Sequence, residues 1–227
     1  MSKKIFITGT GTDVGKTFVT GLIVKKLKES GRNAAYYKAA MSGNERRADK
    51  SLIPGDALYV KNVSGISQPL EEMCPYVYES AVSPHLASRL EGNPVSMDVV
   101  KKGFEAVCNK YDYVTMEGSG GILCPICFDE AKIQLEDVIR ELGLSSLIVA
   151  DAGLGTINSV VLTVEYMRAK KLPVKGILFN HFHPGDVMEE DNLRMCEYMT
   201  KLPVLACVED GSGELAMDVE LLASLYE

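Results

Sequence analysis

The stretch IFITGTGTDVGKTFVTGLIV, Ile5–Val24, constrains the fold of this chain more than any other feature. It begins as a short apolar run, passes through glycines and continues from a Gly-Lys-Thr triplet into a segment with helical apolar spacing. A strand, a glycine-rich turn and a helix in this order place a row of backbone N–H groups at a helix N-terminus, where they bind phosphate. The interval from Gly9 to Gly15 is one residue longer than in the common phosphate loop, which would have a glycine in place of Thr10. The stretch predicts a variant nucleotide loop; the alternative is a chance turn before a helix that starts with lysine.

Three residues at the end of this loop have separate roles in such a site. Gly15 lets the backbone approach a phosphate closely, because any Cβ would intrude. Lys16 would reach the terminal phosphates, and the hydroxyl of Thr17 would coordinate Mg²⁺. We therefore expect a nucleoside triphosphate and Mg²⁺ as ligands.

Short apolar runs alternate with longer amphipathic segments along the chain. The expected strands are Ile5–Thr8, Ala34–Lys38, Tyr113–Glu117, Leu147–Asp151, Gly176–Asn180 and Val204–Cys207, and the expected helices are Thr17–Ser30, Ser96–Asn109, Gln134–Leu142, Ile157–Lys170, Asp186–Thr200 and Glu214–Tyr226. Most strands are continuous apolar runs, as in sheets buried on both faces. The alternation predicts an α/β fold with a P-loop NTPase-like, mostly parallel sheet and helices on both faces, in three layers.

The length of 227 residues favours one domain, residues 1–227, over two. Within it, the stretch Ala39–Val95 is rich in Gly, Pro and Ser and is predicted to form long loops. Those loops would lie over the carboxyl ends of the strands, where ligands bind in folds of this class.

The charge balance of 24 basic against 31 acidic residues gives a net charge of −7, so we expect no nucleic-acid partner. No segment approaches the ~20 apolar residues of a membrane span, so we expect no membrane partner either. The opening MSKKIFITG has only a short apolar run, and six cysteines are scattered along the chain. A cytoplasmic protein with reduced thiols is the expectation.

Polar residues at the ends of expected strands and helices are candidates for the site. Lys38 could neutralise charge on a reacting group, or could be a surface lysine. Asp56 could cap a helix or bind a metal, and Glu117, followed by glycines, is a candidate metal ligand. Asn180 could read a base edge through its amide or could start a turn.

Six motifs make this constellation specific. They are TGTGTDVGKT, YKAAMSG, GDALYV, SPHLASRLEG, VTMEGSGG and GLGTINSVVLT. Their order and approximate separations resemble those of the dethiobiotin synthetase family, from Lys4 to about Asn180. That family closes the ureido ring in the penultimate step of biotin synthesis, with ATP and CO₂ as co-substrates. The long interval in the phosphate loop resembles the family's own version of it.

The resemblance implies a reaction in three steps. One amine of 7,8-diaminopelargonate takes up CO₂ as a carbamate, the carbamate oxygen attacks the γ-phosphate of ATP, and the second amine closes the ring of dethiobiotin and expels phosphate. Such phosphoryl transfer depends on positioning and charge neutralisation. By this resemblance, the Mg²⁺ ligands are Thr17, Asp56 and Glu117. The implied phosphate contacts are Asp13, Val14, Gly15, Lys16, Thr17 and Phe18, and the residues beside the nucleotide are Gly118, Ser119 and Gly120. The implied catalytic residues are Lys38, Lys16, Thr12 and Ser42, and all of these except Lys16 also contact the carbamate or its parent amine.

The segment GLGTIN resembles the part of the family that receives the substrate carboxylate on backbone amides at a helix start. The residues are Gly153, Leu154, Gly155, Thr156, Ile157 and Asn158. In the family this segment comes from the partner subunit, so the resemblance implies a homodimer. Helix N-termini suit carboxylates on physical grounds as well.

The base site departs from the family pattern. Better-known members carry an Ile-Pro-aromatic sequence over the base, whereas this chain has CVEDGSGEL, with Val208, Glu209 and Asp210. Asn180 matches the family's base-reading amide, but His181 replaces its usual acidic neighbour. The predicted base site consists of Asn180, Val208, Glu209 and Asp210. The resemblance implies that the nucleotide is ATP.

Two further motifs and two other classes of protein offer alternatives to this interpretation. The CPIC sequence at Cys124 and Cys127 is interpreted as two loop cysteines, and the pair His181 and His183 as a chance pair without a third metal ligand. A partitioning ATPase that switches with nucleotide would carry a second lysine early in the loop, where Gly11 and Thr12 stand. An amidotransferase-type synthetase, such as the cobyrinate diamide family, would need a further glutaminase domain.

Overall fold

A computed structural model describes residues 2–227, with a six-stranded sheet in the order β10-β9-β8-β1-β5-β2 at its centre. Every neighbouring pair in this sheet is parallel. Its strands are β1 (Lys3–Gly9), β2 (Ala34–Lys38), β5 (Tyr113–Gly121), β8 (Ser146–Asp151), β9 (Val174–Asn180) and β10 (Val204–Val208). The predicted mostly parallel sheet is confirmed, and each predicted strand is found with ends extended by up to four residues.

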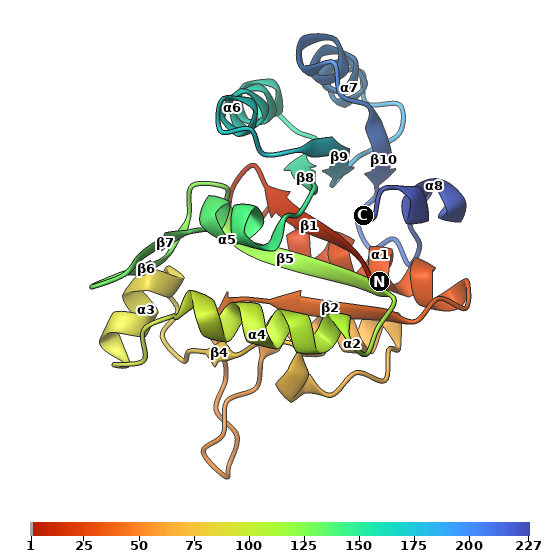
Figure 1. Ribbon diagram of the computed structural model, residues 1–227. Helices are drawn as coiled ribbons and strands as arrows, with labels where there is room; N and C mark the ends of the chain where they lie inside the picture. Colours follow the sequence, from red (N-terminus) through yellow and green to blue (C-terminus); the bar gives the residue numbers. More distant parts are fainter. Residues whose placement is uncertain (1) are drawn as a thin grey trace.

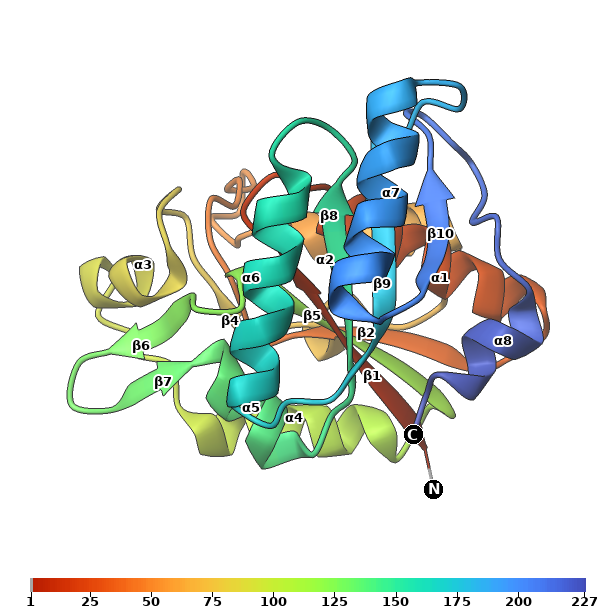
Figure 2. The same ribbon diagram turned by 90° about the horizontal axis from the view of Figure 1, so that it is seen from above.

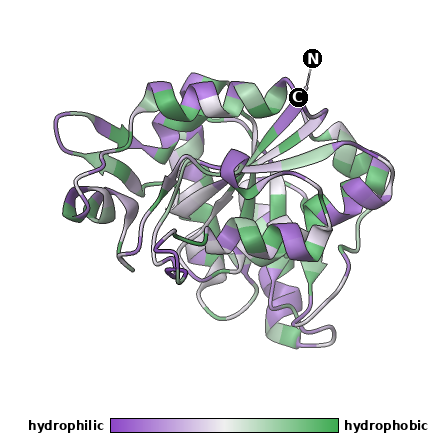
Figure 3. Cartoon of the chain, turned by 90° about the horizontal axis from the view of Figure 1, so that it is seen from below, coloured by the Kyte–Doolittle hydropathy of each residue, from purple (hydrophilic) through white to green (hydrophobic). Residues whose placement is uncertain are grey.

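Two apolar clusters, one on each face of the sheet, fix the layers. Along β1, Ile5 and Ile7 pack into one cluster and Phe6 into the other, and all three are fully buried. The Ile5 face is covered by α1 (Lys16–Glu29), α2 (Gly55–Ser64) and α8 (Val219–Ser224), and the Phe6 face by α4 (Met97–Cys108), α5 (Leu135–Leu142), α6 (Thr156–Ala169) and α7 (Val187–Thr200), as Figures 1 and 2 show. Hydrophobic and hydrophilic residues are interleaved along these helices (Figure 3). The sheet and its two helical coverings form the predicted three-layer arrangement.

The stretch Ala39–Val95, predicted as long loops, contains more regular structure than expected. It holds α2, α3 (Pro84–Leu90), a 3₁₀ turn η1 (Leu70–Glu72) and the paired short strands β3 (Ala40–Met41) and β4 (Tyr76–Val77). The sequence of α2, GDALYVKNVS, has low helix propensity because of its valines, asparagine and glycine. Tertiary packing compensates: an added Cβ at Gly21 of α1 would meet Val63 of α2 at 3.3 Å, so the two helices are in close contact.

Two local predictions are wrong for physical reasons. The helix expected at Glu214–Tyr226 begins only at Val219, because the Asp218 side chain accepts the backbone N–H groups of two following residues and caps it there. Cys127 lies in a strand and not in a loop, since β6 (Pro125–Phe128) and β7 (Lys132–Gln134) form an antiparallel hairpin. His181, directly after β9, adopts a left-handed backbone with φ of 55°.

The edge of the sheet at β2 is closed by side-chain and backbone bonds. The buried Gln68 amide accepts from the backbone N–H of Tyr36 at 2.8 Å and donates to its carbonyl at 3.0 Å. The backbone N–H of Lys38 donates to the carbonyl of Met73. The strand is therefore held on both sides, which fixes the direction of its side chains toward the carboxyl edge of the sheet.

Within residues 2–227, no helix combines the length and apolar character that crossing a membrane requires.

Candidate active site

The phosphate loop ends at Gly15, a position where any side chain would clash with a neighbouring residue. Gly15 has φ of 80°, in the left-handed region, and precedes the first residue of α1. A Cβ there would lie 2.0 Å from the side-chain nitrogen of Asn180 at the end of β9. Lys16 is buried and donates to the Gly11 carbonyl at 2.7 Å, so its ammonium lies across the loop. The loop is thus a tight turn packed against the end of a second strand.

Two carboxylates and a hydroxyl converge beside this loop. The Lys38 ammonium donates to Asp56 Oδ2 at 2.6 Å and to Glu117 Oε1 at 2.7 Å. The Thr17 hydroxyl donates to the same Glu117 oxygen at 2.8 Å. The four residues come from α1, the end of β2, the first turn of α2 and β5, and the side chain of Glu117 is fully buried. The fold therefore assembles at one point what lies far apart in the sequence.

Burial and neighbouring charges move the pKa values of three groups in the cleft. Burial lowers the pKa of Lys16, and the Lys38 ammonium lowers it further. Burial alone would lower the pKa of Lys38, but the Glu117 and Asp56 carboxylates outweigh it and raise that pKa above the usual lysine value. Burial would raise the pKa of Asp56, but the charge and hydrogen bond of Lys38 hold it below its usual value. At neutral pH, Lys38 is consequently charged and Asp56 ionised.

The three predicted metal ligands fit a divalent cation of the Mg²⁺ type. Thr17, Asp56 and Glu117 offer oxygen donors only, which is the set that Mg²⁺ prefers. The two carboxylates already bind one cation, because the Lys38 ammonium lies within hydrogen-bonding distance of both.

A cleft of about 760 Å³ opens in front of this cluster. Most predicted catalytic and phosphate-site residues line it: Thr12, Asp13, Gly15, Lys16, Thr17, Phe18, Lys38, Ser42, Asp56, Glu117, Ser119 and Gly120. Val14 and Gly118 do not. Val14 is nearly buried beneath the loop, and Gly118 packs so closely on Phe6 that a Cβ would come within 2.9 Å of the ring.

Sequence reasoning missed one wall of the cleft. It is formed by Met41 and Gly43 after β2, by the segment Ala81, Val82, Ser83 and Pro84 that leads into α3, and by Cys124. The motif SPHLASRLEG was the available signal, since it starts within this wall. Tyr36 was also missed; its hydroxyl lies 3.2 Å from Glu117 Oε2, and a buried tyrosine in a strand gives no sign of such a contact in the sequence.

The GLGTIN segment lies apart from the cleft of its own chain. Gly153, Leu154, Gly155 and Thr156 line a separate hollow of about 240 Å³ beside Thr10 and Gly11, and Ile157 and Asn158 do not line it. The helix α6 starts here at Thr156, after Gly155 with φ of 91°. The Leu154 side chain is 92% exposed, so the tip of this turn projects from the surface.

The predicted base residues gather at the ends of β9 and β10, with different exposures. Asn180 is fully buried, its Nδ2 donates to the Val14 carbonyl at 3.3 Å, and its Oδ1 has no hydrogen-bond partner. Val208 is buried and its carbonyl accepts the backbone N–H of Phe182, whereas Glu209 and Asp210 are exposed. The carboxamide thus contacts the phosphate loop directly.

The nearby histidines are paired with carboxylates. His181 Nδ1 lies 2.7 Å from Asp151 Oδ2, and His183 Nδ1 lies 3.0 Å from Glu189 Oε1. The pKa of His183 is raised by its hydrogen bond and charge interaction with Glu189. Across residues 2–227, no group of three or more His, Cys, Asp or Glu side chains is arranged to hold a metal ion.

A parallel sheet with a glycine loop, a Lys-Thr helix start and acids at neighbouring strand ends defines a nucleotide-binding protein of the P-loop NTPase class. A family model described as an AAA domain matches residues 3–212. Among solved structures, the MinC:MinD cell division complex and MinD of Aquifex aeolicus share this fold, with TM-scores of 0.58 and 0.54 at 14% and 13% identity, over 94% and 92% of this chain and 87% and 82% of theirs.

Two curated relatives are much closer in sequence. The ATP-dependent dethiobiotin synthetase BioD of Clostridium botulinum (strain Loch Maree / Type A3) is 47% identical over 227 residues, which is 100% of this chain and 99% of that protein. The protein of the same name from Brachyspira hyodysenteriae (strain ATCC 49526 / WA1) is 49% identical over the full length of both chains. The chain belongs to the dethiobiotin synthetase family.

Proposed function

We propose that this protein is an ATP-dependent cyclo-ligase that converts 7,8-diaminopelargonate and CO₂ to dethiobiotin, with ADP and phosphate as the other products. Membership of the family supports the overall reaction. In this chain, the main support for the proposed reaction is that one cleft is lined by Lys16, Thr17, Lys38, Asp56 and Glu117. Two ammonium groups and a set of oxygen ligands at one point suit the neutralisation of a reacting triphosphate.

Each residue of the cleft has a role in this proposal. Asp13 to Phe18 wrap the phosphates, with Lys16 directed to the terminal one, and Ser119 and Gly120 flank the nucleotide. Thr17, Asp56 and Glu117 would hold Mg²⁺, which when bound would supply positive charge against the phosphates. Lys38 orients the carbamate oxygen toward the γ-phosphate and neutralises the charge that passes between them. Thr12 and Ser42, both on the wall of the cleft, donate hydrogen bonds to the carbamate or accept them from the amine.

The atoms balance along this path. A free amine adds to CO₂ and loses a proton, which gives the carbamate. The carbamate oxygen then forms a bond to the γ-phosphorus as the bond to ADP breaks. The second amine attacks the carbonyl carbon, loses a proton and expels phosphate with the former carbamate oxygen, which closes the cyclic urea.

The substrate carboxylate is assigned to the GLGTIN segment of a partner subunit in a homodimer. Two observations support this: the segment does not line the cleft of its own chain, and Leu154 projects into solvent from it. Successive backbone N–H groups at the start of α6 would bind the carboxylate. We also assign the base to Asn180, Val208, Glu209 and Asp210, and the enzyme to the cytoplasm, in keeping with six free cysteines.

The proposal is tested by phosphate release in the presence of Mg²⁺, ATP and bicarbonate, with and without the diamine. Release that depends on the diamine, with dethiobiotin detected by mass spectrometry, is the expected result. Release that ignores the diamine and rises only with a protein or lipid partner would identify a nucleotide-dependent switch instead. Release of neither kind would contradict both functions.

A further inference from the structure

Tyr36 lies behind the carboxylate cluster, on the side away from the cleft. It is the third residue of β2, two positions before Lys38, so both side chains point to the same face of the sheet. The Tyr36 side chain is fully buried and does not line the cleft. Its hydroxyl lies 3.2 Å from Glu117 Oε2. It therefore contacts the acid from the protein interior.

The contact divides the two oxygens of Glu117 between two tasks. Oε2 accepts from the Tyr36 hydroxyl, whereas Oε1 accepts from both Thr17 and Lys38. The Tyr36 hydroxyl is the donor of this hydrogen bond and Glu117 Oε2 is its acceptor. A carboxylate held by one oxygen cannot rotate freely about its last bond.

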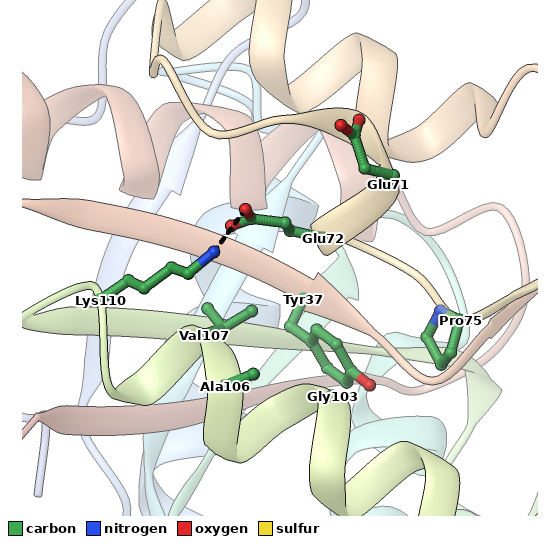
Figure 4. Close-up of a pocket in the computed structure, with 8 residues that line it drawn as sticks. All are labelled: Tyr37, Glu71, Glu72, Pro75, Gly103, Ala106, Val107 and Lys110. Atoms are coloured by element: carbon green, nitrogen blue, oxygen red, sulfur yellow. Dashed lines mark hydrogen bonds and ion pairs between the residues drawn. The ribbon is translucent and has the colours of Figure 1, made fainter.

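Tyr36 is itself held in place from two sides. Its backbone N–H and carbonyl are bracketed by the Gln68 amide, and its ring belongs to the apolar cluster on the α1 face of the sheet. The neighbouring Tyr37 points to the opposite face, where its hydroxyl donates to the Val100 carbonyl of α4. Figure 4 shows Tyr37 beside Gly103 in a different pocket, which neither Glu117 nor Asp56 lines.

We propose that Tyr36 is a positioning residue for Glu117, fixing Oε2 so that only Oε1 faces the Mg²⁺ position beside Thr17. The inference rests on the proposed function for the identity of the metal position. Partners of this kind orient the ligands of metal sites, and their loss typically weakens metal affinity by 10–100-fold. Because Tyr36 touches neither the nucleotide position nor the cleft, its effect should be confined to the metal.

The test compares Tyr36→Phe with Tyr37→Phe, adjacent buried tyrosines that each lose one hydroxyl. ADP binding is measured by calorimetry, in EDTA and across a titration of Mg²⁺, and folding is checked by circular dichroism. For Tyr36→Phe we expect the Mg²⁺ concentration at half-maximal effect to rise about ten-fold, with ADP affinity in EDTA unchanged. For Tyr37→Phe we expect both values to stay within about two-fold of the wild type.

An unchanged Mg²⁺ dependence in a folded Tyr36→Phe protein, or an equal shift in Tyr37→Phe, would overturn the inference. Should Tyr36→Phe fail to fold, a crystal structure of the wild type with Mg²⁺ and ADP decides: the inference requires Tyr36 on Glu117 Oε2, and bidentate binding of the metal by Glu117 overturns it. None of these measurements needs the diamine. Failure of the proposed function would instead appear as wild-type protein that binds Mg²⁺ and ADP normally and never consumes the diamine.

Discussion

At the scale of single residues, the cleft is governed by one ammonium group shared between two acids. Lys38 Nζ lies 2.6 Å from Asp56 and 2.7 Å from Glu117, and its side chain is only 7% exposed. A strand-end lysine and two acids were predictable from the motifs, but the triangle they form was not. It depends on β2 and β5 lying side by side, with Lys38 directly opposite Glu117 in the register.

Lys38→Met, which keeps the length of the side chain, separates the structural and catalytic roles of this ammonium. Turnover should fall by at least about 100-fold, because charge on the transferring phosphoryl group is no longer neutralised. Without ligands the variant should lose about 3 kcal/mol of unfolding free energy, since Glu117 and Asp56 are left without their cation. Mg²⁺ with ADP should restore much of that loss, as measured by denaturant unfolding with and without ligand.

The exposed ion pair of Lys101 with Glu141 provides the control. Lys101→Met should change stability by less than about 0.5 kcal/mol and leave turnover intact. Wild-type turnover in Lys38→Met would remove this residue from the proposed chemistry.

Gly15 illustrates a second effect at this scale, a clash that adds to backbone strain. Gly15→Ala should cost about 3 kcal/mol of stability, from a left-handed alanine and from the Cβ contact with Asn180. Gly31 has nearly the same φ, +82°, with open space around it, so Gly31→Ala measures the strain alone, about 1 kcal/mol. Equal unfolding free energies for the two variants in urea would show that the Asn180 contact relaxes without cost.

At the scale of elements, the agreement between sequence and structure follows the strength of the apolar pattern. Five of the six predicted helices, α1, α4, α5, α6 and α7, begin and end within one residue of expectation, because their buried faces repeat along the whole length. The missed elements are short or have weak propensity: α2, α3, the β3–β4 pair and the β6–β7 hairpin. Each is stabilised by contacts with distant segments, such as Gly21 with α2, and a local pattern cannot report those.

The contact between α5 and α6 includes a buried acid with a pH-dependent role. Burial would raise the pKa of Glu136, but hydrogen bonds from Tyr166 and Lys170 outweigh it and hold that pKa below its usual value. An acid whose pKa is lower in the folded state stabilises the fold at pH values above its unfolded pKa, roughly 4.3. That contribution is lost as the pH falls through its folded pKa. Glu136→Gln should therefore cost about 1 kcal/mol at pH 7 and nothing at the acid end.

The measurement is the unfolding free energy in urea between pH 3 and pH 7. Glu141 lies on the same helix in an exposed pair, and Glu141→Gln should leave the curve close to that of the wild type. A constant difference between Glu136→Gln and the wild type at every pH would contradict the assigned ion pair.

At the scale of the whole molecule, the sequence predicted the class of fold and the edge of the sheet at which most of the candidate residues lie. It could not predict how exposed each candidate is. Asn180, read as a base contact, is fully buried against the phosphate loop, and the GLGTIN segment lies in a hollow outside the cleft. The burial of Asn180 depends on its contact with Val14, which lies 166 residues earlier in the chain.

The proposed homodimer makes a prediction at the same scale. Leu162 on α6 is 62% exposed, on the helix that follows the GLGTIN segment. Leu162→Glu should shift the mass measured by analytical ultracentrifugation from twice 24.7 kDa toward the single chain, and activity should fall with it. Leu90 on α3 is equally exposed, at 64%, and Leu90→Glu should keep the dimer. A wild-type protein that sediments as a single chain at assay concentration and is fully active would contradict the assigned partner segment.

The proposed function requires that a carbamate oxygen made from CO₂ attacks the γ-phosphate of ATP in this cleft. Its most direct measurement uses ¹⁸O-labelled bicarbonate and CO₂ in unlabelled water, with ATP, Mg²⁺ and the diamine, and mass spectrometry of the phosphate released at short times. We expect the released phosphate to carry one ¹⁸O atom, and we expect no labelled phosphate when the diamine is left out. Diamine-dependent phosphate that takes its new oxygen from the water alone would show hydrolysis of ATP and contradict the claim.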